Sequence, residues 1–345
     1  MNIEQFKLQF KLLISNADKS DSNYFYVNSI RDIVVSGKSV EANSRMPQMW
    51  AIKERNWKLW PKAKKVGKYP LSIDIESSAK CNLRCKMCSI DFGKINGGFM
   101  DMDLYKYIVS QFKYTMPVSV KFNWRGEPLM NKNLPEMIAR AHDAGVVETQ
   151  INTNGLLLDD DMRRELIDAG LSRIKISIDS IDKDKYKKIR GADFDVVKNN
   201  ILSLMLGISN NKFPIVQVQM VYDNESVDEL FDYYKYWNNI VDYIGFSRMH
   251  GTNKYKREDC KSVPCPQPFQ RLLVTYDGNI VPCCMDRDLK MSLGNARDVR
   301  IIDAWNHPRL SFYRKMHATG NSDELSTCKV CDINKICTKG DDLFK

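Results

Sequence analysis

The chain has 345 residues, of which 43% are hydrophobic and 28% are charged. This balance is typical of a globular protein and excludes a disordered chain, a collagen-like fibre and a bare coiled coil. No apolar run reaches the roughly 18 residues of a membrane helix, and no cleavage site follows the amphipathic start. We therefore expect a cytoplasmic protein with no membrane partner.

The chain is basic, with 52 Lys and Arg against 43 Asp and Glu and a net charge of +9. Such an excess is compatible with nucleic acid, a membrane surface or a phosphorylated substrate. The densest basic stretch, 53–68, interleaves Lys and Arg with Trp57 and Trp60. It indicates an arm whose tryptophans pack on the body, or alternatively a nucleic-acid-binding segment. Because no nucleic-acid-binding motif accompanies it, we do not expect a nucleic-acid partner.

Residues 1–70 show no consistent period and are treated as an N-terminal extension. From residue 71, strand-like alternation and helical spacing follow one another. The predicted strands are 71–78, 118–124, 148–153, 173–179, 215–222 and 243–249. The predicted helices are 102–114, 134–144, 160–169, 196–206 and a last helix through Trp237 that begins with a Ser226/Glu229 capping box.

This alternation predicts an α/β protein whose core, 71–250, is a partial (β/α)6 TIM-like barrel with a parallel sheet. Ligands collect at the carboxyl ends of parallel strands, and the distinctive residues lie there. Three cysteines follow the first strand, Gly126-Glu127-Pro128 follows the second, and Asn152-Thr153-Asn154-Gly155 closes the third. Residues 251–345 hold seven cysteines, which predicts a small C-terminal domain built around a metal site.

The first cysteine group, Cys81, Cys85 and Cys88, has C-x3-C-x2-C spacing. In a compartment that keeps thiols reduced, such cysteines bind metal or do chemistry. A 4Fe–4S cube is fully held by four thiolates, so three would leave one iron open for a substrate or cofactor. A zinc site or three idle thiols are the alternatives, although no neighbouring His or Cys would complete a closed zinc site.

Together, the cysteine loop, the Gly126-Glu127-Pro128 motif and the Asn-Thr-Asn-Gly segment resemble those of the radical S-adenosylmethionine (radical SAM) enzymes. The resemblance implies that Cys81, Cys85 and Cys88 hold a 4Fe–4S cluster whose open iron is chelated by S-adenosyl-L-methionine. One electron, from a donor such as flavodoxin or ferredoxin, then cleaves this cofactor. The resulting 5′-deoxyadenosyl radical abstracts a hydrogen atom from the substrate.

The same resemblance assigns further residues to the cofactor. It implies that Gly126 and Glu127 lie at the amino group of S-adenosylmethionine, with Asn154 and Ser177 near its ribose and carboxylate. The alternatives are a loop carboxylate for Glu127 and a turn residue for Asn154.

Two more residues complete the implied cofactor site. Arg190 lies where related sequences carry an arginine that pairs with the cofactor's carboxylate, a role that suits a bidentate guanidinium. The alternative for Arg190 is a surface charge. Phe92 packs beside the cluster or the adenine, or alternatively in the core.

The second cysteine group resembles the SPASM extension of this family and its shorter twitch version. Its pattern is Cys265-x17-Cys283 followed by Cys328-x2-Cys331. The full SPASM pattern, which holds two auxiliary clusters, has a further cysteine where this chain has Asp341. The resemblance therefore implies one auxiliary 4Fe–4S cluster on these four cysteines, with a four-cysteine zinc site as the alternative.

Cys284 directly follows a predicted ligand, so in an extended segment its thiol would project away from that of Cys283. It is a candidate hydrogen-atom donor, as in radical epimerases, or alternatively an inert buried thiol. Cys260 and Cys337 remain unassigned. The histidines are predicted to be structural or solvated, with His250 as the one candidate base.

These features predict a radical SAM enzyme that dehydrogenates or epimerises a carbohydrate- or aminocyclitol-like small molecule. The basic charge suits a sugar carried on a nucleotide. The alternatives are a SPASM maturase that cross-links or epimerises a peptide, and an electron-transfer iron–sulfur protein. The predicted divisions are 1–70, 71–250 and 251–345.

Overall fold

The computed structural model describes residues 2–5, 7–8, 24–28, 48–93, 97–208, 213–222, 225–249, 260–262, 265–331 and 335–337. Within these residues a nine-stranded sheet has the order β1-β7-β6-β5-β4-β3-β2-β9-β10. Its parallel strands in the predicted core are β2 (Ser72–Ile75), β3 (Ser119–Lys121), β4 (Glu148–Thr153), β5 (Arg173–Ser177), β6 (Ile215–Tyr222) and β7 (Tyr243–Arg248). The predicted α/β fold with a partial (β/α)6 barrel is confirmed.

Segments outside 71–250 extend this sheet at both edges. Strand β1 (Tyr24–Asn28) pairs antiparallel with β7, and β9 (Arg271–Val274) lies parallel to β2. Strand β10 (Ile280–Val281) returns antiparallel to β9 after a turn at Gly278, where φ is +96° and a side chain would clash with Asn295. A separate ribbon joins β8 (Cys260–Ser262) to β11 (Lys335–Cys337).

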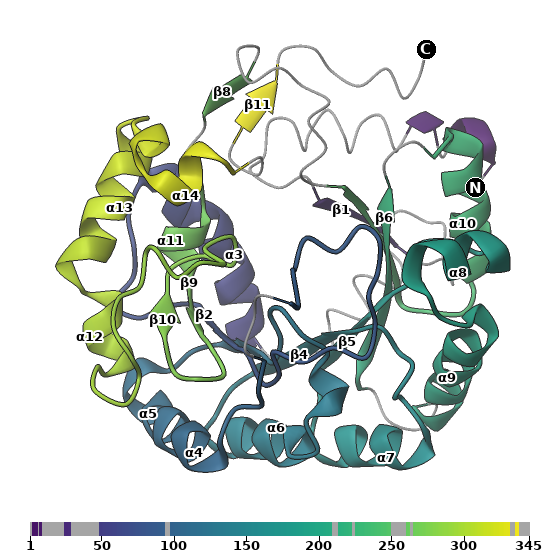
Figure 1. The fold of residues 1–345 in the computed structure, drawn as a ribbon, viewed down its shortest axis with the longest axis horizontal. Helices are drawn as coiled ribbons and strands as arrows, with labels where there is room; N and C mark the ends of the chain where they lie inside the picture. Colours follow the sequence, from purple (N-terminus) through teal and green to yellow (C-terminus); the bar gives the residue numbers. More distant parts are fainter. Residues whose placement is uncertain are drawn as a thin grey trace.

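Helices cover the outer face of the curved sheet (Figure 1). They are α4 (Met102–Ser110), α5 (Phe112–Thr115), α6 (Leu134–Asp143), α7 (Asp160–Asp168), α8 (Lys183–Arg190), α9 (Phe194–Gly207) and α10 (Val227–Trp237). The predicted capping box of Ser226 and Glu229 is present at the start of α10. The sequence analysis missed α8, because its KDKYKKIR sequence has no apolar stripe, although Asp182 caps it.

The alternation along the strands separates an apolar outer face from a polar inner face. Ile73, Ile151 and Ile174 belong to one core cluster with helix side chains such as Leu134 and Ile201. The intervening residues point to the other side of the sheet and line the inside of the barrel. They include Asp74, Lys121, Gln150, Asn152, Arg173, Lys175 and Gln217. Parallel strands buried on both faces are usually continuously apolar, so this inner face is unusually polar.

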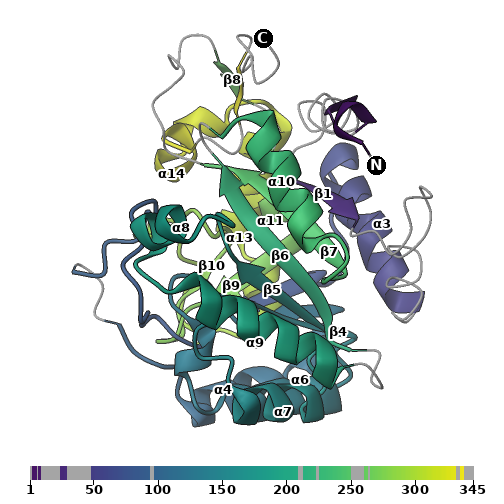
Figure 2. The ribbon, with the colours of Figure 1, turned by 90° about the vertical axis from the view of Figure 1, so that its right-hand side faces the viewer.

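Helix α3 (Gln48–Ala63) packs against the amino-terminal ends of the strands, on the opposite side from α8 (Figure 2). The Trp50 Nε1 donates to Oε1 of Glu148 at 3.0 Å, and Lys53 Nζ donates to Oε2 at 2.8 Å. Glu148 is the first residue of β4, and Arg173 Nε lies 3.3 Å from it. Burial by itself would raise the pKa of Glu148, but Lys53 and Arg173 lower it to about 2. The prediction that the tryptophans of the basic stretch pack on the body is confirmed, because Trp60 packs against the core cluster and the Arg271 guanidinium stacks over Trp57 at 4.8 Å.

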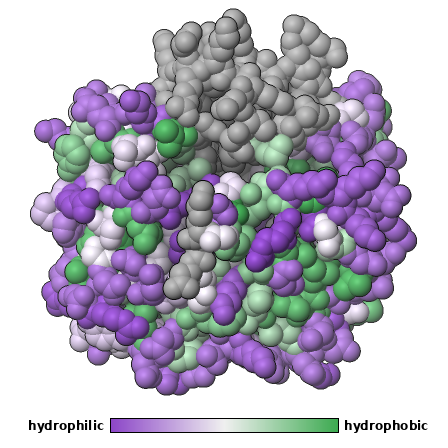
Figure 3. All heavy atoms as spheres, in the orientation of Figure 1, coloured by the Kyte–Doolittle hydropathy of each residue, from purple (hydrophilic) through white to green (hydrophobic). Residues whose placement is uncertain are grey.

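The C-terminal segment shares the core of the barrel. It contains α11 (Gln267–Gln270), α12 (Ile301–Trp305), α13 (Pro308–Ala318) and α14 (Ser326–Lys329). Trp305 and Leu310 belong to the same buried cluster as the strands. In the described part of the chain no helix is long and apolar enough to cross a membrane. On the face in Figure 3, hydrophilic residues cover much of the rim and apolar residues lie in separate patches.

We predict that Glu148→Gln lowers the free energy of unfolding at pH 7 by about 3 kcal/mol, because the buried Lys53 then keeps only the more exposed Glu54 carboxylate as an ion-pair partner and Arg173 also loses its pair with Glu148. Since the pKa of Glu148 is lowered from 4.5 to about 2, its ion pairs stabilise the fold above pH 4.5 and this stabilisation is lost as the pH falls toward 2. The measurement is urea unfolding between pH 7 and pH 3. The control is Glu136→Gln, which breaks an exposed pair with Arg140. Equal losses in both variants would contradict the role of Glu148.

Candidate active site

The first cysteine group lies in the loop that follows β2. The backbone turns between its second and third cysteines, where the Cys88 N–H donates to the Cys85 carbonyl at 3.0 Å. Burial raises the pKa of the Cys81 thiol, and the neighbouring thiols of Cys85 and Cys88 contribute to the same shift. The three thiols are therefore close enough to influence one another's ionisation. Cys88 is exposed, and Cys81 and Cys85 are half-buried. Three thiolates in one loop are a donor set that fits a 4Fe–4S cluster with one open iron.

The C-terminus of α8 anchors this loop. The Lys86 N–H donates to the Ile189 carbonyl at 2.9 Å, and the Cys85 thiol donates to the Arg190 carbonyl at 3.8 Å. The Arg190 guanidinium is buried, and its Nε lies 2.5 Å from Oδ2 of Asp179. Burial would lower the pKa of Arg190, but Asp179 raises it. The alternative of a surface charge for Arg190 is therefore wrong.

Gly126 and Glu127 pack directly against the cysteine loop. A side chain at position 126 would lie 2.4 Å from the Lys80 carbonyl oxygen, so only glycine allows this approach. The Glu127 carboxylate is buried and accepts from Thr153 Oγ1 at 2.6 Å, the Asn154 N–H at 2.7 Å and the Leu129 N–H at 3.1 Å. Burial raises the pKa of Glu127 to about 6, against the lowering effect of these donors. Its carboxylate joins the turn after β3 to the end of β4.

Asn154 continues this connection to the cysteines. Its Nδ2 donates to Oδ1 of Asn82 at 2.7 Å, and its Oδ1 accepts from the Leu156 N–H at 3.0 Å. Asn154 is therefore a turn residue, as the alternative prediction had it. Its amide also contacts Asn82 in the cysteine loop. Ser177 ends β5 opposite Gln219 of β6, on the polar inner face.

Phe92 lies at the rim of the cysteine loop. The Arg84 guanidinium stacks over its ring at 4.7 Å from the centroid. The same guanidinium donates to the carbonyls of Cys81 and Leu83 at 2.9 and 2.8 Å. Phe92 is half-buried and lies outside the core cluster, so the core alternative is wrong.

The four cysteines predicted to hold the auxiliary cluster come from three separate segments. Burial raises the pKa of Cys265, and Cys331, Cys328 and Cys284 are its neighbouring thiols. The turn after Cys283 is tied to α14, because Asp286 accepts from Thr327 Oγ1 at 2.9 Å. Cys265 thus lies within electrostatic range of Cys328 and Cys331, and Cys283 lies within range of Cys265.

This donor set is compatible with a 4Fe–4S cube, in which each iron takes its own thiolate. Among the described side chains, no three of His, Cys, Asp or Glu are grouped so that they could hold a single metal ion.

The predicted direction of the Cys284 thiol is wrong. The chain turns at Cys283, whose Sγ accepts from the Met285 N–H at 3.3 Å, so the segment is not extended. The two adjacent thiols interact, which lowers the pKa of Cys284 and raises that of Cys283. Cys284 is also an electrostatic neighbour of Arg271 and Lys121 on the inner face of the barrel.

Contacts that the sequence analysis did not anticipate link the barrel loops to the C-terminal segment around Cys284. Trp124 Nε1 donates to the Cys284 carbonyl at 2.7 Å, and its ring stacks on Arg125, which forms a bidentate pair with Glu76. Arg287 Nη1 donates to the Ser89 carbonyl at 3.1 Å. The position of Trp124, two residues before Gly126, was the available signal in the sequence.

The sequence analysis also did not identify His317 as a residue of the auxiliary site. It is buried in the last turn of α13, and its two ring nitrogens contact residues of the auxiliary group, Cys265 at 3.2 Å and Cys328 at 3.5 Å. Burial lowers the pKa of His317 to about 4. No signal in the sequence could have revealed this contact, because 52 residues separate His317 from Cys265.

The structure does not show the side chains of three further residues that the sequence analysis discussed. The structure does not describe His250, the candidate base. Cys260 and Cys337 face one another in the β8–β11 register, but their side chains are not described.

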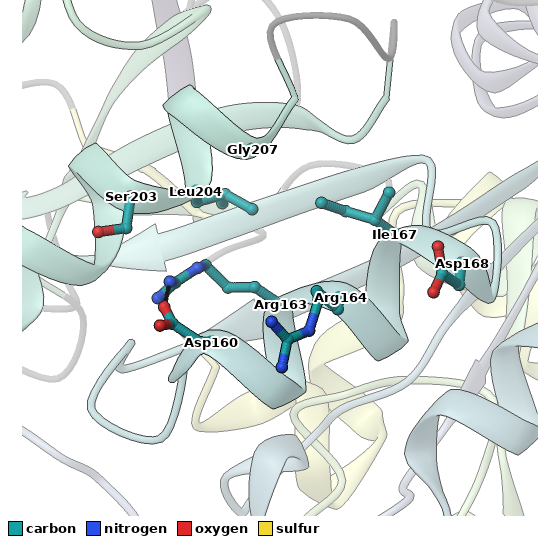
Figure 4. A pocket seen from close by; sticks show the side chains of 8 residues that line it. All are labelled: Asp160, Arg163, Arg164, Ile167, Asp168, Ser203, Leu204 and Gly207. Atoms are coloured by element: carbon teal, nitrogen blue, oxygen red, sulfur yellow. Dashed lines mark ion pairs between the residues drawn. The ribbon is translucent and has the colours of Figure 1, made fainter.

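A surface pocket lies between α7 and α9, on the outer layer of the barrel (Figure 4). Its lining includes Arg163 and Asp160, which form an ion pair, together with Leu204 and Gly207. The pocket contains none of the predicted site residues.

Sequence profiles match most of the chain. Residues 75–250 match the Radical SAM superfamily, and residues 265–332 match an iron–sulfur cluster-binding domain, SPASM. The S-adenosyl-L-methionine-dependent 2-deoxy-scyllo-inosamine dehydrogenase of Niallia circulans is 25% identical over 77% of this chain and 94% of its own length. A probable GTP 3′,8-cyclase of Methanococcus vannielii is 31% identical over 51% of this chain, which spans only 58% of that cyclase.

Solved structures share the fold. BtrN in complex with AdoMet and 2-DOIA has a TM-score of 0.54 at 20% identity, over 76% of this chain and 92% of that chain. SuiB of Streptococcus suis bound to the precursor peptide SuiA has a TM-score of 0.57 at 15% identity, over 99% and 84%.

We predict that Glu127→Gln weakens the binding of S-adenosylmethionine about tenfold and lowers the free energy of unfolding by about 1–3 kcal/mol. The new amide NH2 would face the Asn154 N–H or the Thr153 hydroxyl, so a buried donor loses its acceptor. Equilibrium binding to the reconstituted protein, alongside urea unfolding, checks both effects. Unchanged binding would show that Glu127 serves only the fold.

Proposed function

The chain belongs to the radical SAM superfamily and carries a SPASM-type C-terminal domain, and on this premise we propose that it dehydrogenates or epimerises a polar small molecule related to carbohydrates or aminocyclitols. Its cofactors are S-adenosyl-L-methionine and 4Fe–4S clusters. When bound, they supply a 5′-deoxyadenosyl radical that abstracts a hydrogen atom. In this proposal Cys81, Cys85 and Cys88 hold the cleaving cluster.

The observation that carries the substrate class is the charged inner face of the barrel. Four basic side chains from the alternate strands β3, β5 and β9 lie there, half-buried: Lys121, Arg173, Lys175 and Arg271. Two carboxylates oppose them, since Asp74 pairs with Arg271 at 2.7 Å and Glu148 pairs with Arg173 and Lys53. These strands therefore present more basic than acidic side chains to the interior, which suits a hydroxyl-rich substrate that bears an anionic group.

Lys175 is the basic side chain of the inner face whose charge depends most on its neighbours. Burial lowers the pKa of Lys175 well below its usual range, and the neighbouring cations Lys121 and Arg173 lower it further. An anion beside Lys175 would reverse the repulsion and favour the charged amine. A phosphate of a nucleotide-linked sugar is such an anion, and the likeness to an aminocyclitol dehydrogenase supports a polyol-like acceptor of the radical.

Cys284 is our candidate hydrogen-atom donor for the epimerisation branch. Trp124 holds its backbone through the Cys284 carbonyl, and its thiol is electrostatically coupled to Arg271 and Lys121 on the inner face. In its protonated form this thiol would return a hydrogen atom to the opposite face of the substrate radical, and the thiyl radical left on Cys284 would need one electron and one proton to regenerate the thiol. Without that delivery, loss of a proton to a base and of an electron to the auxiliary cluster would give dehydrogenation.

Peptide modification is the second candidate function, because the SuiB complex shares the fold over nearly the whole chain. That likeness concerns the fold alone. A peptide that stimulates turnover, with deuterium transfer from the peptide into 5′-deoxyadenosine, would replace the small-molecule proposal.

We predict that replacing Cys81, Cys85 and Cys88 together by Ala removes about half the iron and abolishes 5′-deoxyadenosine formation. The control is a triple variant of Cys265, Cys328 and Cys331, which should lose a similar share of iron and retain the ability to cleave S-adenosylmethionine without substrate. The measurements are iron content and product chromatography under anaerobic conditions. Cleavage that persists in the first variant would refute the site.

We predict that Lys175→Met weakens the binding of an anionic ligand about tenfold, through loss of one charge-assisted hydrogen bond. The probes are uridine diphosphate and inorganic pyrophosphate, measured by calorimetry on the reconstituted enzyme. Lys113→Met, on the exposed side of α5, is the matched control. Equal affinity in the wild type and both variants would remove the argument for an anionic substrate.

We predict that, if the enzyme is an epimerase, Cys284→Ser stops deuterium incorporation from D2O into the product while 5′-deoxyadenosine still forms. Mass spectrometry of the product measures the label. Unchanged incorporation would exclude Cys284 as the donor.

A further inference from the structure

His317 connects two of the cysteines assigned to the auxiliary cluster. It lies in the last turn of α13 with only 1% of its surface exposed. Its Nδ1 lies 3.2 Å from the backbone nitrogen of Cys265, and its Nε2 lies 3.5 Å from the sulfur of Cys328. The ring thus contacts the first and third cysteines of the group simultaneously.

These two contacts determine which ring nitrogen carries the proton. A backbone N–H can only donate, so Nδ1 must accept from Cys265 and cannot itself be protonated. A neutral imidazole with a bare Nδ1 carries its proton on Nε2. That proton is directed at the Cys328 sulfur, which in a cluster is a thiolate and can only accept.

We propose that His317 is a positioning residue of the auxiliary cluster, which it serves by donating an N–H···S hydrogen bond to the Cys328 thiolate and thereby raising the reduction potential of that cluster. The inference rests on the auxiliary cluster of the proposed function. Hydrogen bonds to the sulfurs are among the determinants of iron–sulfur potentials. A donor interacts more strongly with the reduced cluster, which carries one more negative charge, so the bond favours reduction.

The surrounding contacts separate this electrostatic role from simple packing. Arg314, one turn earlier on α13, already fixes the segment after Cys265 through the Pro268 carbonyl at 2.9 Å. Asp286 holds α14 through Thr327, independently of the histidine. The segments that carry Cys265 and Cys328 therefore keep their anchors when the Nε2 donor is removed.

The test uses the full-length enzyme with both clusters reconstituted and follows a redox titration by electron paramagnetic resonance. His317→Leu fills the space without a donor, and His317→Gln places an amide N–H near the position of Nε2. His142→Leu, at an exposed histidine of α6, is the control. The auxiliary signal is identified as the one that S-adenosylmethionine does not alter.

In His317→Leu we expect the ratio of reduced to oxidised auxiliary cluster at a fixed potential to fall about tenfold, equivalent to about 59 mV for a one-electron couple. The other cluster should keep its potential, and His317→Gln should stay close to the wild type. If His317→Leu loses the auxiliary iron, His317→Gln decides. Retained iron with a wild-type potential supports the donor role, and lost iron or a lowered potential overturns it.

The same experiment separates the two proposals. A wild-type protein with about four irons and a single signal would remove the auxiliary cluster itself. A wild-type protein with about eight irons and equal potentials in His317→Leu would overturn the role of His317 alone.

Discussion

A hydrogen-bonded connection from Glu127 through Asn154 to Asn82 holds the carboxyl ends of three strands together. Six parallel strands deliver their loops to one edge, but register alone does not orient the loops. The buried Glu127 carboxylate fixes the end of β4, and the Asn154 amide then reaches the loop that carries the cysteines. Gly126 allows this because its backbone lies against the Lys80 carbonyl. The proposed cofactor site depends on this arrangement.

The barrel interior explains how a shared fold can serve a particular substrate. Outward-facing aliphatic residues join the helices in one core, which leaves the inward positions of the strands available for polar chemistry. In this chain those positions hold more basic than acidic side chains, and α3 contacts the amino-terminal end of β4 through Glu148. Recognition of the substrate would then come from the inner face and from the C-terminal segment that carries Cys284.

The sequence pattern predicted those strands and helices whose limits are set by local alternation or helical spacing. Strands β4 and β6 begin and end where the alternation indicated, because alternate residues face the core and the polar interior. Helix α8 lacks an apolar stripe, and β9 joins the sheet beside β2 through contacts almost 200 residues apart, so neither was predicted. Likewise, the cysteine spacing is a local signal that can be read from the sequence, whereas the contacts of His317 and the turn at Cys283 depend on tertiary packing.

The central claim is that three cysteines leave one iron open to S-adenosylmethionine. Electron–nuclear double resonance on the reduced enzyme, with the cofactor labelled by ¹⁵N at its amino group, tests it most directly. The account predicts a nitrogen coupling to one cluster that disappears when unlabelled cofactor displaces the label. A reduced, cofactor-saturated enzyme without such a coupling would contradict it.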